Sequence, residues 1–159
     1  MKNAVLLVAI WAAIIAVASG YMLLQRVPEQ QTFEFYSGGA YHVEGHGEWT
    51  VKLDTTGGFS LIHDVRGEVK DYGTFLLFDQ ERLGLWRLIR GIAIEDLESS
   101  DRQGVPEEVQ YTFVLRDDQQ VHSVSMWLND ARQEEGIVAL VEELAVLIEK
   151  FVGEKPVLY

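Results

Sequence analysis

An uncharged apolar run near the N-terminus constrains this chain more than any other feature. Residues 4–24 (AVLLVAIWAAIIAVASGYMLL) hold 21 side chains without a single charge. As a helix, such a segment is about 31 Å long, which matches the roughly 30 Å hydrocarbon core of a bilayer. Tyr21 stands near the end of the run, where interfacial aromatic residues are common. The run therefore predicts an N-terminal transmembrane helix, and we assign residues 1–28 to an anchor.

A cleaved signal peptide is the alternative interpretation of the same segment. Lys2 supplies a short positive region, and Ala16-Val17-Ala18 resembles a cleavage site. The apolar run continues to Leu24, beyond that site, which favours an uncleaved signal-anchor of a single-pass membrane protein. Positive charge before the run slightly exceeds that after it, which predicts an extracytoplasmic, periplasmic location for the rest of the chain.

Small residues recur at intervals of four within the apolar run. Ala9 and Ala13 form one such pair, and Ala12 and Ala16 form another. Small residues at this spacing let two membrane helices approach closely. They therefore predict a membrane-packing face, with alanines that simply face lipid as the alternative.

The remainder of the chain is strongly acidic. Of the chain's 25 acidic and 13 basic residues, only Lys2 and Arg26 fall within the first 28 positions, so the rest carries a net charge of −14. Such a surface repels phosphate groups, which argues against nucleic-acid binding and against a domain lying on anionic lipid. It suits a solvated domain or one facing a basic partner. The absence of cysteine excludes disulfides and thiolate metal sites.

Residues 29–159 have the pattern of a single α+β domain. Alternating apolar residues predict five or six strands, and two stretches with helical periodicity predict two helices. The fold class is therefore an N-terminal transmembrane helix followed by a two-layer domain of antiparallel sheet with two helices on one sheet face. The expected strands are residues 32–36, 49–55, 59–65, 70–77, 109–115 and 121–127, and the helices run from Asp79 to about Ile92 and from about Ala131 to Val152.

The second and third strands predict a hairpin with a defined register. A three-residue loop at residues 56–58 pairs Thr55 with Phe59 and Leu53 with Leu61. This register gathers the apolar side chains on one face and places a glycine at the left-handed loop position. A two-residue loop would mix the two faces and is rejected.

Three polar residues at alternate positions are the only candidate metal ligands. His42, Glu44 and His46 would share one face of an extended segment, where two imidazoles and a carboxylate could hold zinc. Polar residues at a surface or sheet edge are the alternative, and the neighbouring glycines favour it. The glycine-rich stretches match no phosphate-binding motif. We therefore assign no catalytic residue and no cofactor.

Two tryptophans are candidate interface residues. Trp86 lies off the main apolar stripe of its predicted helix, and Trp127 ends the last predicted strand. Exposed tryptophan is enriched at protein interfaces. Core packing is the alternative for both residues.

The order of elements from residue 33 to residue 153 resembles the emfourin-type domain, a small bacterial module. The resemblance rests on the strand ending in FYSGG at residues 35–39, the helix led by Asp79, the strands YTFVL and HSVSMW, and the C-terminal helix. Founding members of that family inhibit thermolysin-like metalloproteases. The resemblance implies a binding domain without catalysis, although this chain has an added apolar segment and a longer hairpin region.

Together these observations predict a non-catalytic, membrane-anchored accessory subunit. Its expected partners are subunits of a larger membrane protein complex and the lipid bilayer through residues 4–24, with no nucleic acid. A membrane-tethered metalloprotease inhibitor, with a protease as partner, is the first alternative. A metal-dependent enzyme using His42, Glu44 and His46 is the second.

Overall fold

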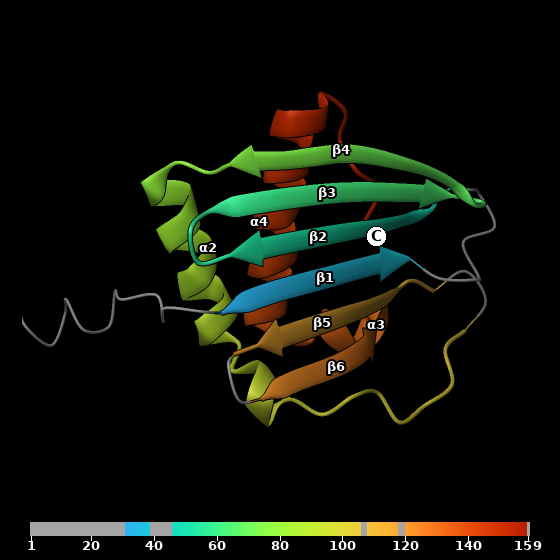
Figure 1. Cartoon of the computed structure of the whole chain (residues 1–159). Coiled ribbons are helices and arrows are strands. Elements are labelled where there is room, and N and C mark those ends of the chain that lie inside the picture. The colour runs from blue at the N-terminus through green and yellow to red at the C-terminus, as the bar shows by residue number, and fades with distance from the viewer. Residues whose placement is uncertain (1–30, 39–45, 106–107, 118–119, 159) are drawn as a thin grey trace, which may run out of the picture.

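The computed structural model describes residues 31–38, 46–105, 108–117 and 120–158. In these ranges, six strands form one antiparallel sheet in the order β4-β3-β2-β1-β5-β6 (Figure 1). The strands are β1 (Thr32–Gly38), β2 (Glu48–Asp54), β3 (Gly58–Val65), β4 (Glu68–Leu76), β5 (Gln110–Arg116) and β6 (Val121–Trp127). The helices are α2 (Asp79–Gly91), the 3-10 turn η1 (Ile94–Asp96), α3 (Leu128–Ala131) and α4 (Glu135–Val152).

One face of the sheet forms the core with the helices. Along β1, Phe33 and Phe35 are fully buried, while Glu34 and Tyr36, which alternate with them, are only partly covered. In Figure 1, α4 runs behind the sheet and α2 lies by the ends of the strands, and buried residues of both helices share one core with the phenylalanines. Burial of this apolar surface is the main force that holds the two layers together. We call the opposite side of the sheet, on which none of the described helices packs, the open face.

The transmembrane part of the predicted fold class is corrected. In the described ranges, no helix is long and apolar enough to cross a membrane. The longest, α4, carries five charged residues among its 18, so it is amphipathic and covers the sheet. The predicted anchor at residues 4–24, including Ala9, Ala12, Ala13 and Ala16, lies outside the described residues. The single-pass membrane assignment and the periplasmic location that followed from it are therefore withdrawn.

The predicted register of the β2–β3 hairpin is wrong by two residues. Leu53 pairs with Phe59 rather than with Leu61, so the loop consists of residues 55–57. A shift of two keeps every side chain on its predicted face. The hairpin therefore contributes the expected apolar residues to the core through different pairs.

Asp54 explains why the loop begins one residue earlier. Its carboxylate accepts hydrogen bonds from the backbone nitrogens of Thr56 at 2.8 Å and Gly58 at 2.9 Å. Gly57 takes the left-handed conformation, with φ of 98°, and its nitrogen donates to the Asp54 carbonyl oxygen. Desolvation alone would raise the pKa of Asp54, but a hydrogen bond from the Thr56 hydroxyl, together with these backbone bonds, outweighs it and holds the pKa below its usual value.

The predicted C-terminal helix is interrupted near its start. The one-turn helix α3 follows β6 directly, and Arg132 to Glu134 form a turn before α4 begins at Glu135. The apolar stripe of α4 starts only at Ile137, so residues before it have no stripe to bury along the same axis. Gly153 ends α4 in the left-handed conformation, as its position predicts.

The two edge strands of the sheet differ in whether another segment covers them. The segment before β5 lies along β6, where the Ser100 nitrogen donates to the Ser125 carbonyl oxygen at 2.9 Å. The Ser125 nitrogen in turn donates to the Ser99 hydroxyl. At the other edge, β4 carries a bulge at Gly73 and ends at Leu76, whose side chain is 74% exposed. In the described part of the chain, β6 thus has a covered edge and β4 has an open one.

Candidate functional site

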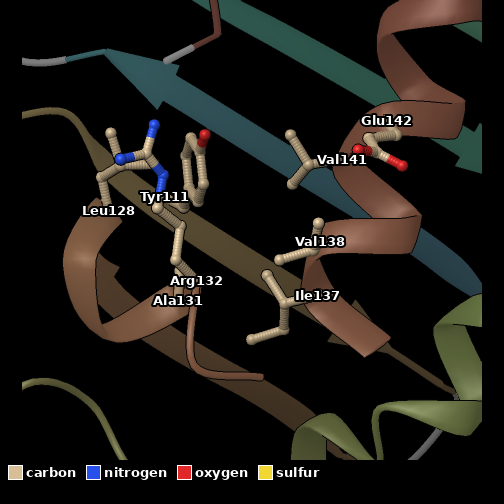
Figure 2. A pocket seen from close by; sticks show the side chains of 8 residues that line it. All are labelled: Tyr111, Leu128, Ala131, Arg132, Ile137, Val138, Val141 and Glu142. Carbon is tan, nitrogen blue, oxygen red and sulfur yellow. The ribbon is translucent and has the colours of Figure 1, made fainter. Parts of the chain in front are cut away.

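A pocket of about 240 Å³ lies between the last helices and the sheet. Figure 2 shows its lining side chains converging from β5, from α3 and the turn after it, and from the first half of α4. The lining is mostly apolar, with one tyrosine and two charged side chains. The residues are Tyr111, Leu128, Ala131, Arg132, Ile137, Val138, Val141 and Glu142.

A group of ion pairs fixes α3, which forms one wall of the pocket. The Arg102 guanidinium donates to both oxygens of Glu108, at 2.9 and 2.6 Å, and its Nε lies 3.0 Å from Asp130. The other donors to Glu108 are backbone nitrogens, including that of Asn129 in the first turn of α3. Carboxylates favour the N-terminal end of a helix because unpaired N–H groups point there. The arrangement therefore ties the segment before β5 to α3.

The ionisation of this group follows from its geometry. The Arg102 hydrogen bonds outweigh burial and lower the pKa of Glu108 to about 2. The bond from Ser100, followed by that from Arg102, also lowers the pKa of Asp130. The same carboxylates raise the pKa of Arg102, so all three groups stay charged at neutral pH. The pocket wall is therefore held by fixed charges.

Tyr111 forms the floor of the pocket and is itself fixed by the end of the chain. Its ring is buried and packs against Phe35 and Phe113, with centroids 5.4 and 6.2 Å away. Its hydroxyl donates to the Leu158 carbonyl oxygen at 2.7 Å. Leu158 is fully buried, so the segment after α4 returns to the core. This contact holds the tyrosine ring in place below the pocket.

The two charged side chains stand at opposite sides of the pocket. Arg132 follows α3 and Glu142 lies on α4, and Figure 2 shows their polar groups on either side of the Tyr111 ring. Both residues are exposed. Among the residues that the structure describes, neither side chain makes a hydrogen bond or an ion pair. Both are therefore available to a bound group.

The size and lining of the pocket suit an apolar group the size of a side chain. Pockets for drug-sized ligands usually measure about 300–1,000 Å³. An apolar cavity of about 150 Å³ is large enough to bind benzene. At about 240 Å³, the pocket falls between these values. It can accommodate one large aliphatic or aromatic side chain, with a charge available on each side.

Only one of the three candidate metal ligands lies within the described residues. His42 and Glu44 lie outside the described residues, and His46 is described. The His46 carbonyl oxygen lies 2.6 Å from Nε2 of His63, whose ring stacks on Trp49 at a centroid distance of 4.0 Å. Among the described residues, no group of three or more potential ligands could hold a metal ion. The candidate metal site, for which the sequence favours the alternative of polar surface residues, is therefore not tested by the described residues.

The two candidate interface tryptophans use their indole nitrogens within the fold. Trp86 is only 1% exposed, and its Nε1 donates to the Asp54 carbonyl oxygen at 3.3 Å. It lies on the buried side of α2 and supports the β2–β3 loop. Trp127 is partly exposed, its ring packs against Gly104, and its Nε1 donates to the Arg102 carbonyl oxygen at 3.0 Å. Only Trp127 therefore retains surface that a partner could contact.

The sequence did not predict the pocket. Its lining comes from β5, α3, the turn after α3 and α4, which no local pattern brings together. The one available signal was the absence of an apolar stripe before Ile137, which marks where the helix is interrupted. No family model matches this chain, and no curated protein matches it either. The resemblance to emfourin-type domains therefore stays a prediction.

Proposed function

We propose that this domain is a non-catalytic protein-binding domain that accepts one large apolar side chain of a partner in the pocket. The observation that carries the proposal is an apolar pocket of about 240 Å³ with two charged side chains available at its rim. Binding energy at protein interfaces is concentrated in a few anchor residues that fill such pockets. Because the floor and wall of the pocket are already fixed, the domain loses little conformational entropy when the partner binds, which favours binding.

Charge complementarity favours a basic partner segment. Glu134 and Glu135 precede the pocket-lining part of α4, Glu142 lies at the rim, and all three are exposed. The whole chain has a net charge of −12. A lysine or arginine next to the apolar anchor would pair with Glu142, while Arg132 would donate to a main-chain carbonyl of the partner. We therefore expect an apolar residue flanked by a basic one.

A substitution that fills the pocket tests this function. The full chain is used to select peptides from a displayed random library, and the enriched sequences are compared. We expect large apolar residues next to Lys or Arg. In Val138→Phe, the added ring occupies the pocket, so affinity for the enriched peptides should fall by about tenfold, equivalent to about 1.4 kcal/mol. Fluorescence anisotropy of labelled peptides measures the affinity.

The matched control is the same change elsewhere on α4. Val146 is 59% exposed and does not line the pocket, so Val146→Phe should leave affinity unchanged. Thermal unfolding of both variants checks that each is folded. Failure to enrich any common sequence, or equal affinity for Val138→Phe and the natural chain, would exclude the pocket as the binding site.

A further inference from the structure

A carboxylate on the open face is shared by two basic side chains from neighbouring strands. Glu34 lies on β1, Lys52 on β2 and Arg116 on β5, and β1 runs between the other two strands. The Glu34 side chain is only 13% exposed, whereas Lys52 and Arg116 are about half exposed. The two cations therefore cover the carboxylate and present their remaining surface to solvent.

Neither cation makes a close contact with Glu34. The Lys52 Nζ and the Arg116 Nε each lie 3.6 Å from the same oxygen, Oε1. Charged hydrogen bonds between nitrogen and oxygen are usually about 2.7–2.9 Å long. The other oxygen of Glu34 accepts the hydroxyl of Tyr36. A single carboxylate oxygen of Glu34 is thus shared by two cations, each at more than hydrogen-bonding distance.

The cluster has more donors than acceptors. A lysine ammonium offers three N–H donors and an arginine guanidinium offers five. In the described part of the chain, Lys52 and Arg116 form ion pairs with no acidic residue besides Glu34. The group has one net positive charge, although the chain as a whole has a net charge of −12. Unused donors and a local positive charge are what an anion requires.

The spacing of the two cations suits a single oxyanion. Because both nitrogens lie 3.6 Å from the same oxygen, they are at most 7.2 Å apart. An anion with two or more oxygens, each bound at about 2.8 Å, can bridge such a span. Arginine also binds planar or tetrahedral oxyanions through two parallel hydrogen bonds. The open sheet face leaves room for the anion to approach.

We propose that the open face binds an oxyanion, a carboxylate or phosphate group, between Lys52 and Arg116. The anion accepts hydrogen bonds from both cations on their solvent-facing side, while Glu34 holds them in place from below and competes for the same charge. Tyr36 keeps one oxygen of Glu34 occupied and so limits that competition. This site is separate from the pocket and does not depend on its function.

Amide NMR titration of the full chain tests the proposal with two probes. Sodium phosphate and sodium acetate are added separately, and sodium chloride at equal ionic strength shows the effect of salt alone. We expect saturable shifts centred on Glu34, Lys52 and Arg116 with at least one oxyanion but not with chloride. Comparison of the two anions tells whether phosphate or carboxylate is preferred.

Matched variants locate the bound anion. Lys52→Gln with Arg116→Gln should weaken binding by at least about tenfold, because each change removes one bridging donor. Arg87→Gln with Lys155→Gln removes the same charge from exposed positions elsewhere and should have no such effect. Glu34→Gln should bind more tightly because the competing charge is gone. Each single variant is also measured, in case the double variant is unstable.

Three results would each overturn the proposal. One is a set of shifts that chloride reproduces in full, which would mean that only ionic strength acts. The second is equal loss of affinity in the two double variants, which would mean that net charge rather than this pair attracts the anion. Weaker binding to Glu34→Gln would also contradict the proposal, since the anion would then not compete with that carboxylate.

Discussion

Glu108 illustrates how a single buried charge can hold a segment in place. Its side chain is 2% exposed, yet the carboxylate accepts hydrogen bonds from Arg102 and from the backbone nitrogens of Val105 and Asn129. Arg102 and Val105 belong to the segment before β5, whereas Asn129 belongs to α3, so the carboxylate joins two parts of the chain at the pocket wall. Burial of a charge is costly unless it is paired in this way. The stability of this part of the fold therefore depends on the Glu108 carboxylate staying ionised.

We predict that Glu108→Gln destabilises the protein at neutral pH but less so in acid. The folded pKa of about 2 lies below the ordinary value of 4.5, so the charged form stabilises the fold above about pH 4.5. That contribution is lost as the pH falls through about 2. We expect a loss of about 3 kcal/mol at pH 7 and a smaller one at pH 3, measured by urea unfolding.

An exposed acidic residue in the same segment provides the control. Glu98→Gln should change the free energy of unfolding by less than about 0.5 kcal/mol at either pH. A difference between Glu108→Gln and the natural chain that stays constant from pH 7 to pH 3 would show that the carboxylate is not the source of the stability.

The geometry of the β2–β3 hairpin depends on one side chain, that of Asp54. We predict that Asp54→Ala lowers the free energy of unfolding by about 1 kcal/mol, because Thr56 and Gly58 lose their acceptor. Asp54→Asn keeps one acceptor oxygen and should cost less. Hydrogen exchange measures the local effect: the Gly58 amide should exchange faster in Asp54→Ala. Unchanged protection at Gly58 would contradict the assigned role of the carboxylate.

The same hairpin shows what local patterns can and cannot predict. Alternation along β2 and β3 predicted which side chains face the core, because that depends only on the period of two. The register depended on the choice of Asp54 as the loop's hydrogen-bond acceptor, and several short polar residues competed for that role. The residues that determine such a turn are close together in the sequence, but more than one of them could serve as the acceptor, so the sequence alone does not select the register.

The interruption between α3 and α4 depends on residues that lie far from it in the sequence, so the local pattern could not predict it. The start of α3 is stabilised by Glu108, about 20 residues earlier in the chain, and the pocket floor by Leu158, 47 residues after Tyr111. Periodicity predicted the α4 stripe from Ile137 onwards but carried no information about these partners. The pocket therefore could not be predicted, although most elements that line it could.

At the scale of the whole molecule, the open β4 edge is a place where unwanted contact with other chains can form. Unpaired backbone groups and apolar side chains at a sheet edge favour association with other chains. Leu76 and Phe78 are 74% and 73% exposed at the end of this edge. The bulge at Gly73 interrupts the edge nearer its middle and leaves the end uninterrupted.

We predict that Leu76→Lys raises solubility without loss of stability. The free energy of unfolding should change by less than about 0.5 kcal/mol, because the side chain is exposed. The concentration at which light scattering rises should increase, because the added charge opposes edge-to-edge pairing. Ser123→Lys, on the exposed part of β6, is the control and should have a smaller effect. Equal effects of the two changes would indicate a general response to charge rather than an edge effect.

The position of α4 after all six strands has a consequence for synthesis on the ribosome. The strands emerge first, and their inner face, with Phe33, Phe35 and Phe113, is to be covered by a helix made later. Until α4 has emerged, much of that apolar surface lacks its partner and is open to chaperones or to neighbouring nascent chains. Translational pausing before α4 should therefore lengthen this vulnerable interval, whereas pausing after α4 should leave the yield of folded protein unchanged.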